Sequence, residues 1–417
     1  MKTVDRIAVI GLGYIGLPTA IAFAQAGKQV LGVDCNLDVL ATLKQGKAHI
    51  AEPHLEKALQ QVMNEQRLSV SATLDNADVF IIAVPTPLQS NFQPDLSYVH
   101  TAALQIAPYL QQGNVVVLES TSPVGTTEQL AYWLSEVRTD LRFPDDVAVA
   151  YCPERVLPSN IMQEIIHNDR IIGGLSPNCT EQAVNLYKIF VKGECLTTNA
   201  RTAELCKLTE NSFRDVNLAF ANELSMICHQ LNIDVWELIR LANRHPRVQI
   251  LQPSAGVGGH CIAVDPYFIV SQLPEYARLI RTAREVNRNK PQWVIEQVKL
   301  AVAECATELN CSPSQLKIAC FGLTFKADID DLRESPALQI TQQLANWHSG
   351  QLFAIEPNIS HRPIVLPDNV AFVTPNEALE NADILVLLVN HKQFQQINVQ
   401  HIQQKWIIDT QGSWQKK

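Results

Sequence analysis

Residues 6–20, with the sequence RIAVIGLGYIGLPTA, decide the fold because they combine a short apolar run, a glycine-rich turn and the start of a helix. The uncharged run that contains them, residues 7–27, is long enough to span a membrane or to serve as a signal peptide. It is broken, however, by helix-disfavouring residues at four positions, namely Gly11, Gly13, Gly16 and Pro18. We therefore expect a buried strand, a turn and a helix through about residue 26, and no membrane span.

The three glycines have the spacing Gly-x-Gly-x-x-Gly, and the next apolar run, residues 29–33, is followed by Asp34. In such a turn Gly11 allows the tight bend, Gly13 lets the backbone approach a pyrophosphate, and Gly16 permits close packing of helix on strand. The N-terminus of the helix attracts the negative charge. Asp34 can hydrogen-bond both ribose hydroxyls and would repel a 2′-phosphate, so the pattern indicates NAD in preference to NADP. A glycine turn with a merely solvated Asp34 is disfavoured, because strand, turn, helix and acid occur in this order.

Strand-like and helical segments alternate in two parts of the chain. The β-branched runs at residues 79–84 and 115–118 continue the first alternation to about residue 195, which predicts a parallel sheet with crossover helices. A second pattern of this kind begins near residue 313. Its expected elements are strands at residues 316–321, 384–389 and 406–409 and a helix around 336–348.

The intervening residues 200–243 contain neither Pro nor Gly and have apolar residues at helical spacing after Asn199, a suitable N-cap. We expect one long helix that joins two domains and packs against a partner subunit, with helical structure continuing to about residue 309. The predicted fold class is α/β. Two Rossmann-like, doubly wound parallel-sheet domains, residues 1–198 and 312–417, are joined by a central helical region, residues 199–311.

The composition excludes several classes of protein. Of the 417 residues 47% are hydrophobic and 18% are charged, and the formal net charge is −9. A chain of this composition is not globally disordered. Its acidity argues against a general nucleic-acid or membrane-surface binder, so an anionic ligand would need a few local basic residues. The ten cysteines form no Cys-x-x-Cys pair, which is typical of reduced thiols in a cytoplasmic protein.

Cys261 differs from the other cysteines because it ends the glycine-rich loop Gly-Val-Gly-Gly-His-Cys at residues 256–261. A loop without side-chain bulk would let a substrate approach the backbone and the sulfur. Asp265 would lie on the same side as the sulfur if the chain turns helical there. A packing cysteine remains the alternative. His260 has no second His or Cys at metal-binding spacing, so we expect no metal site.

Lys207 and Asn211 are four residues apart on the expected long helix and therefore share one of its faces. An apolar helix has little reason to carry this pair unless the two side chains meet something polar. A solvated ridge remains the alternative. Asp215 continues the same row, where it could pair with Lys207.

Seven collinear motifs resemble the UDP-glucose/GDP-mannose 6-dehydrogenase family from end to end. They are GLGYIGLPTA (11–20), LESTSPVGTTE (118–128), AYCPERVLP (150–158), RTAELCKLTENSFRDVNLAFANEL (201–224), LIRLANRHPRV (238–248), GVGGHCIAVDP (256–266) and FGLTFKADIDDLRESPA (321–337). The resemblance implies a four-electron oxidation of the C6 alcohol of a nucleotide sugar to a carboxylate, with two NAD and one water. Cys261 then matches the nucleophile that forms a thiohemiacetal and a thioester.

The resemblance also implies roles for the other residues. Lys207 matches the lysine that stabilises oxyanions, Asn211 its partner, and Asp265 the carboxylate that assists proton transfer, while Thr121 and Glu154 match residues that order water. The implied cofactor contacts, besides the three glycines, are Tyr14, Ile15, Asp34, Thr86, Thr121 and Arg333. The implied substrate contacts are Arg155, Val156, Lys207, Asn211, Arg244, His245, Arg247, Gly259, Phe325 and Lys326. In the family the basic segment around Arg244 comes from the neighbouring subunit, which implies a homodimer through the central helix.

Three residues beside the catalytic motif bear on the substrate. His260, Ile262 and Val264 differ from the residues usual in UDP-glucose enzymes and match the N-acetylhexosamine branch of the family. Within that branch the segments STSPVGTTE and NRHPRVQIL are more similar to enzymes for UDP-N-acetyl-D-mannosamine than to those for UDP-N-acetylglucosamine. The resemblance therefore implies a UDP-N-acetylhexosamine substrate, and a product used for a surface glycan such as enterobacterial common antigen or a capsule.

Two further classes remain as alternatives. A two-electron hydroxyacid dehydrogenase also pairs Lys with Asn on a long helix, but it needs no cysteine, so Cys261 disfavours it. An inactive NAD-sensing or scaffolding protein is disfavoured by the complete set of catalytic residues.

Overall fold

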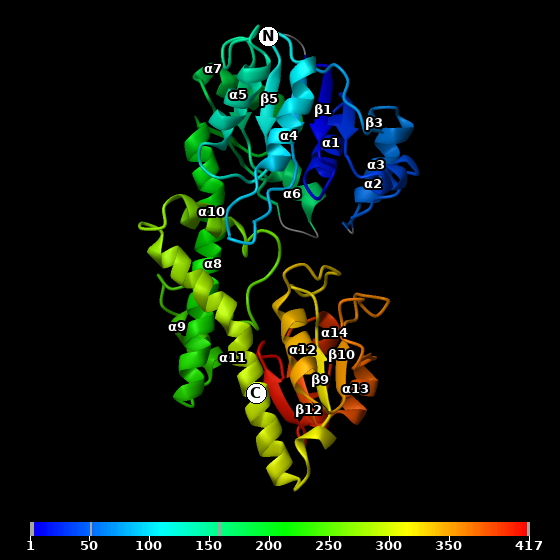
Figure 1. The fold of residues 1–417 in the computed structure, drawn as a ribbon, viewed down its shortest axis with the longest axis vertical. Coiled ribbons are helices and arrows are strands. Elements are labelled where there is room, and N and C mark those ends of the chain that lie inside the picture. The colour runs from blue at the N-terminus through cyan, green and yellow to red at the C-terminus, as the bar shows by residue number, and fades with distance from the viewer. Residues whose placement is uncertain (1–3, 51, 157–159, 415–417) are drawn as a thin grey trace. The chain divides into compact units, whose positions relative to one another are not determined.

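The computed structural model describes residues 4–50, 52–156 and 160–414, and the chain divides into two compact units (Figure 1). Unit 1 comprises Met1–Glu210 and Tyr267–Gln272, and unit 2 comprises Asn211–Pro266 and Leu273–Lys417. Each unit contains one sheet in which nearly all neighbouring strands are parallel. Two Rossmann-like sheets and a helical central region are therefore confirmed.

Unit 1 is built on an eight-stranded sheet in the order β3-β2-β1-β4-β5-β6-β7-β8, with only β6 and β7 antiparallel. The first six strands have the doubly wound order, which reverses between β1 and β4. The strands are β1 (Arg6–Ile10), β2 (Gln29–Val33), β3 (Leu68–Ser71), β4 (Val79–Ile82), β5 (Val115–Leu118), β6 (Ala148–Tyr151), β7 (Arg170–Gly174) and β8 (Cys195–Asn199).

Both faces of this sheet are buried, as expected for a parallel sheet with crossover helices. Along β1, Ile7 and Val9 join one apolar cluster, and Ala8 and Ile10 join another. The first cluster includes side chains of α1 and α3, and the second includes those of α4 and α5. The helices of unit 1 are α1 (Gly16–Gln25), α2 (Leu37–Lys44), α3 (Leu55–Asn64), α4 (Ser97–Ile106), α5 (Thr126–Val137), α6 (Ile161–His167) and α7 (Pro177–Tyr187), with the 3-10 turn Ala107–Tyr109 after α4.

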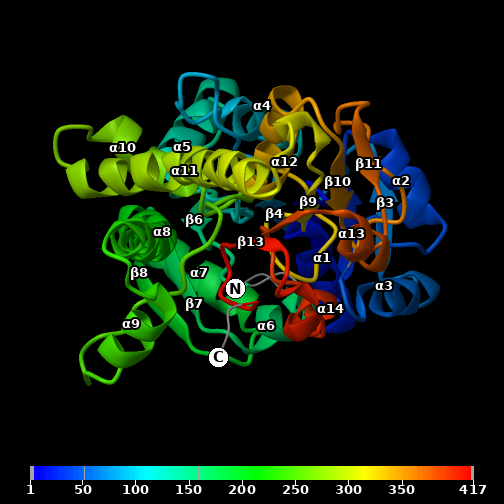
Figure 2. The ribbon, with the colours of Figure 1, turned by 90° about the horizontal axis from the view of Figure 1, so that it is seen from below.

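Unit 2 contains an all-parallel sheet in the order β11-β10-β9-β12-β13. Side chains of α11 and α12 pack on one face of this sheet, and those of α13 and α14 pack on the other (Figure 2). The strands are β9 (Ile318–Phe321), β10 (Leu352–Ile355), β11 (Val370–Phe372), β12 (Ile384–Leu387) and β13 (Trp406–Asp409). The helices are α9 (Val235–Ala242), α11 (Arg278–Glu308), α12 (Pro336–Trp347), α13 (Pro375–Asn381) and α14 (Lys392–Gln395).

The helix α8 (Ala200–Gln230) contains the boundary between the units, as does the short α10 (Asp265–Gln272). Asn199 caps α8 as predicted, since its side-chain oxygen accepts from the backbone N–H of Thr202 at 2.9 Å. The prediction of one helix across residues 200–243 is wrong beyond Gln230, where α8 ends. Asn232 adopts a left-handed conformation (φ 53°) that ends the helix, and the Asp234 side chain accepts from two backbone N–H groups to start α9.

Buried polar bonds join α11 to the part of α8 that belongs to unit 2. The Arg284 guanidinium lies 2.6 Å from the Asp215 carboxylate, and the Asn222 amide donates to Asn287 at 2.9 Å. Asp215 therefore pairs with Arg284, where the sequence leaves a pairing with Lys207 open. A lysine two turns away along a helix is farther from a carboxylate than a cation supplied by the neighbouring helix.

The helices of the described residues include none that is long and apolar enough to cross a membrane. The uncharged run of residues 7–27 instead forms β1, a turn and α1.

Candidate active site

The turn after β1 has the geometry of a dinucleotide site. Gly11 adopts φ +91°, and its backbone N–H donates to the Val33 carbonyl at 2.8 Å. The Asp34 carboxylate accepts from the backbone N–H of Leu12 at 2.9 Å, which fixes it beside the turn. A Cβ placed on Gly13 would meet nothing within 4 Å, so the backbone there faces open space. These features fit an NAD pyrophosphate at the start of α1 and a ribose at Asp34.

The other cofactor candidates of unit 1 lie on adjacent loops at the carboxyl ends of the strands. Tyr14 and Ile15 follow β1 and lead into α1. Thr86 follows β4, and its hydroxyl donates to the carbonyl of Thr121, after β5, at 2.6 Å. Unit 1 thus brings these residues together at the switch point of its sheet, where doubly wound proteins bind ligands.

Lys207 and Glu154 form a buried ion pair within unit 1, with 2.9 Å between Nζ and Oε1. The two residues are 5% and 7% exposed. Burial alone would raise the pKa of the Glu154 carboxyl, but the Lys207 charge and the backbone N–H of Val156 lower it below its usual value. Lys207 is therefore buried and paired, which excludes the alternative of a solvated ridge for this residue.

A second buried ion pair, Glu119 with Arg170, was not singled out from the sequence. Arg170 Nη1 lies 3.3 Å from Glu119, which also accepts from the Thr19 hydroxyl on α1 at 3.0 Å. Burial outweighs the Arg170 charge and raises the pKa of Glu119 to about 7. Arg170 also approaches the carbonyl of Pro153, next to Glu154. The signal in the sequence is an acid directly after the apolar strand β5.

Cys261 and Asp265 lie one turn apart in unit 2, because the Cys261 carbonyl accepts from the backbone N–H of Asp265 at 2.8 Å. The chain turns helical there, as α10 begins at Asp265. The Asn211 amide donates to the Asp265 carboxylate at 2.5 Å, and Asp265 is 3% exposed. The half-buried Cys261 therefore neighbours a carboxylate whose position Asn211 holds.

The glycines before Cys261, predicted to give a substrate access to the loop, make room for neighbouring protein atoms. A Cβ on Gly258 would lie 2.2 Å from the Glu334 carbonyl oxygen. Gly259 has φ +84°, and a Cβ there would lie 2.8 Å from the Phe325 ring. Both glycines are therefore required for close packing against residues 325–336.

The candidate arginines have different surroundings. Arg155 lies 2.9 Å from Glu210, and Arg333 forms an ion pair of 2.6 Å with Asp331. Arg244, His245 and Arg247 are exposed just after α9.

The predicted site residues are divided between the two units. Unit 1 contains the cofactor turn, Thr86, Thr121, Glu154, Arg155, Val156 and Lys207, and unit 2 contains Asn211, the basic segment, Gly259, Cys261, Asp265, Phe325, Lys326 and Arg333. Lys207 and Asn211 share one face of α8, and the unit boundary falls between them. Leu157 and Pro158, at the end of the third motif, lie outside the described residues. Across residues 4–50, 52–156 and 160–414, no group of three or more His, Cys, Asp or Glu could hold a metal ion.

Family models match three consecutive parts of the chain. They are described as the NAD binding domain (residues 5–191), the central domain (201–289) and the UDP binding domain (319–416) of the UDP-glucose/GDP-mannose dehydrogenase family.

Named relatives are similar over nearly the full length. The chain is 58% identical to UDP-N-acetyl-D-mannosamine dehydrogenase of Escherichia coli K12, covering 98% of this chain and 99% of that protein. It is 53% identical to NDP-N-acetyl-D-galactosaminuronic acid dehydrogenase of Ralstonia nicotianae, covering 99% and 96%. Its fold is similar to the solved structure of UDP-D-ManNAc dehydrogenase from Pyrococcus horikoshii, with a TM-score of 0.89, 40% identity and coverage of 99% and 96%.

Proposed function

Because the chain belongs to the UDP-glucose/GDP-mannose dehydrogenase family, whose first domain binds NAD, we propose that it oxidises UDP-N-acetyl-D-mannosamine at C6 to the uronate. The protein is thus an NAD-dependent oxidoreductase. The E. coli relative, at 58% identity, supports the mannosamine substrate. The observation that carries the four-electron chemistry is Cys261 on the turn into Asp265, whose carboxylate Asn211 holds.

The proposed reaction balances as two oxidations with one water. NAD, held at the turn after β1, would supply the hydride acceptor for each oxidation. In the first, the C6 alcohol also loses a proton and becomes an aldehyde. The Cys261 thiolate then adds to the aldehyde carbon to give a thiohemiacetal, which loses hydride and proton to become a thioester. Water cleaves the thioester, which releases the carboxylate and restores the thiol.

The buried groups of each unit have distinct roles in this proposal. Lys207 is held by Glu154 and stabilises the oxyanion that forms when a proton leaves oxygen or a nucleophile adds to carbon. Asn211 supplies a neutral donor, and Asp265 accepts a proton when water attacks. Glu154 and Thr121 order that water.

Cofactor and substrate contacts complete the assignment. We propose that NAD is held by Gly11, Gly13, Gly16, Tyr14, Ile15, Asp34, Thr86, Thr121 and Arg333. The UDP-sugar is held by Arg155, Val156, Lys207, Asn211, Arg244, His245, Arg247, Gly259, Phe325 and Lys326. Arginine suits the diphosphate because a guanidinium group can donate two parallel hydrogen bonds to phosphate oxygens. A few local cations would thus let an acidic protein bind a dianion.

The experiment that tests this function measures NADH released per sugar consumed. We expect two NADH per UDP-N-acetylmannosamine and little reaction with UDP-N-acetylglucosamine, its C2 epimer, or with UDP-N-acetylgalactosamine. One NADH per sugar would contradict the thioester mechanism and favour a two-electron dehydrogenase. Preference for UDP-N-acetylgalactosamine, whose uronic acid the Ralstonia relative's name mentions, would correct the substrate alone.

A homodimer through α8 is part of the proposal. One face of α8 carries three exposed apolar side chains, Phe213, Phe220 and Ile227, which are 69%, 51% and 46% exposed. They are seven residues apart, which is about two helical turns, so they form one apolar stripe along the helix. A shallow hollow beside the stripe is lined in part by Ile227, Leu231 and Trp293. Contiguous exposed apolar surface on a helix is typical of a contact with another subunit.

Phe220→Asp should convert the dimer to a monomer, because a carboxylate in an apolar contact would be desolvated without a partner. Light scattering coupled to gel filtration measures the mass. The matched control is Ile364→Asp, at a residue that is 98% exposed in the other part of unit 2 and should leave the dimer intact. Unchanged mass for Phe220→Asp would contradict this interface.

We also propose three domains, residues 1–198, 199–311 and 312–417, and a cytoplasmic location. The three family models support this division in order, although the chain clusters into two compact units. A reducing compartment would keep the Cys261 thiol available as a nucleophile.

A further inference from the structure

The turn after β9 in unit 2 has the same hydrogen bonds as the cofactor turn of unit 1. The backbone N–H of Gly322 donates to the Ile355 carbonyl at 2.8 Å, and that of Leu323 donates to the Glu356 carboxylate at 2.8 Å. In the cofactor turn the corresponding backbone N–H groups, those of Gly11 and Leu12, donate to the carbonyl at the end of β2 and to the Asp34 carboxylate. Glu356 therefore occupies in unit 2 the position that the cofactor acid occupies in unit 1.

The two acids differ in their access to a ligand. Asp34 is partly exposed, whereas Glu356 is 4% exposed. Besides Leu323, one Glu356 oxygen accepts from Thr324 N–H at 3.2 Å and lies 3.0 Å from Nε2 of the fully buried His391. The other oxygen accepts from the backbone and side chain of Asn358. Glu356 is thus bonded within the protein, where a ribose hydroxyl would bind in a dinucleotide site.

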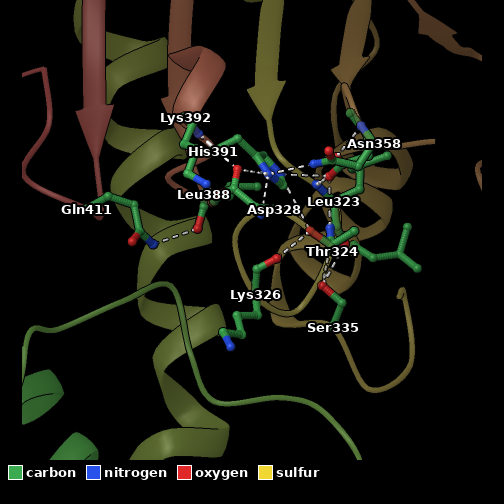
Figure 3. Close-up of polar contacts among 12 residues, drawn as sticks. Leu323, Thr324, Lys326, Asp328, Ser335, Asn358, Leu388, His391, Lys392 and Gln411 are labelled. Atoms are coloured by element: carbon green, nitrogen blue, oxygen red, sulfur yellow. Dashed lines mark hydrogen bonds and ion pairs between the residues drawn. The ribbon is translucent and has the colours of Figure 1, made fainter. Parts of the chain in front are cut away.

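His391 links the acid to a second point of the same loop. Its Nδ1 accepts from the backbone N–H of Asp328 at 2.9 Å (Figure 3). Because a backbone N–H can only donate, Nδ1 is unprotonated, and Nε2 carries the hydrogen that is donated to Glu356. His391 itself precedes α14, after β12. The imidazole therefore bridges the loops that follow three neighbouring strands of the sheet.

The segment that these bonds hold is residues 323–328. Glu356 fixes its first two residues, and His391 fixes its last, Asp328, which has a left-handed conformation (φ +62°). Within the loop, the Thr324 hydroxyl donates to the Lys326 carbonyl at 2.8 Å. Figure 3 shows the Lys326 side chain extending away from this cluster. The backbone of Phe325 and Lys326 is thus fixed from both ends.

We propose that Glu356 and His391 are positioning residues for the UDP-sugar, because they hold the loop that presents Phe325 and Lys326. The inference rests on the proposed role of those two residues in substrate binding. In a dinucleotide site the acid after the second strand binds a ribose. Here Glu356 has that position but orders the backbone of a loop that binds a different nucleotide. Neither residue touches the reacting atoms.

The test uses His391→Gln and His391→Asn in the full-length enzyme. Gln can keep a donor near Glu356 but loses the acceptor that Asp328 N–H shares with the Asn358 amide, whereas Asn can keep that acceptor and loses the donor to Glu356. Each should weaken binding of UDP by about tenfold, because the contacts of one ring nitrogen are lost and the loop is no longer fixed from both ends. The KM for the UDP-sugar should rise equally, while the KM for NAD stays within about twofold of wild type, since the cofactor turn is in the other unit. The matched control is His401→Gln, at an exposed histidine of unit 2.

Two further measurements keep the outcome clear. Amide hydrogen exchange should show faster exchange at Asp328 in His391→Gln while the protein remains folded by circular dichroism. If the histidine variants do not fold, Thr324→Val leaves His391 in place, removes the bond to the Lys326 carbonyl and the longer 3.5 Å contact with His391 Nε2, and should raise the KM for the UDP-sugar in the same direction. Wild-type UDP affinity in every folded variant would overturn the inference. Failure of the wild-type enzyme to bind UDP would instead overturn the proposed function.

Discussion

Cys261→Ala should lower steady-state NADH production on the order of a thousandfold or more, because the aldehyde would lose the thiol that the proposed mechanism uses to capture it. The first oxidation does not need the thiol, so a rapid-mixing experiment should still show NADH formation, limited to one equivalent per active site. NADH absorbance in the first turnover and in the steady state gives both values. We therefore expect the alcohol oxidation to be retained and the second oxidation to be blocked.

The control for this variant is another thiol of the same unit. Cys311→Ala replaces a partly exposed cysteine after α11 and should leave the rate within about twofold of wild type. Full steady-state activity of Cys261→Ala would contradict the covalent mechanism and return Cys261 to the role of a packing residue. Loss of the first equivalent of NADH as well would mean that the thiol also acts in alcohol oxidation.

Lys207→Met should lower both activity and stability. Methionine fills a similar volume but leaves the Glu154 carboxylate buried without its cation. Breaking one side of a buried ion pair typically costs about 3–5 kcal/mol in the free energy of unfolding. The turnover number should fall by about a hundredfold or more, because an oxyanion would lose its charged donor. Urea denaturation and steady-state kinetics measure the two effects separately.

A double variant separates these two roles of Lys207. Lys207→Met combined with Glu154→Gln removes both charges, so most of the lost unfolding free energy should return while turnover stays low. The exposed Lys188→Met serves as the control and should change neither quantity. Recovery of turnover in the double variant would show that Lys207 only neutralises Glu154. Normal turnover in Lys207→Met alone would exclude the lysine from the chemistry.

The elements whose signals are local could be predicted from the sequence. The strand at Arg6–Ile10, its glycine turn and the Asn199 cap depend on residues that are neighbours in the chain, and all are present in the structure. The break after Gln230 was missed, because Asn and Asp can end or start a helix through their own side chains without any Pro or Gly.

Contacts between distant parts of the chain could not be predicted in the same way. Glu119 with Arg170 and Glu356 with His391 join residues 51 and 35 positions apart, and no periodicity marks such a partner. The row Lys207, Asn211 and Asp215 shows the same limit. The helical spacing gave the shared face, but the structure gives the three side chains three different partners on other segments.

The close packing of Gly258 and Gly259 against the Phe325–Pro336 segment has a consequence for protein engineering. A side chain added to either glycine would overlap the Glu334 carbonyl or the Phe325 ring, and a larger residue in place of Phe325 would press on the loop that leads to Cys261. Substitutions in two segments packed this closely are not additive. Libraries that seek a new sugar preference should therefore vary both segments together, because a change in either segment also shifts the backbone of the loop that carries the Cys261 thiol.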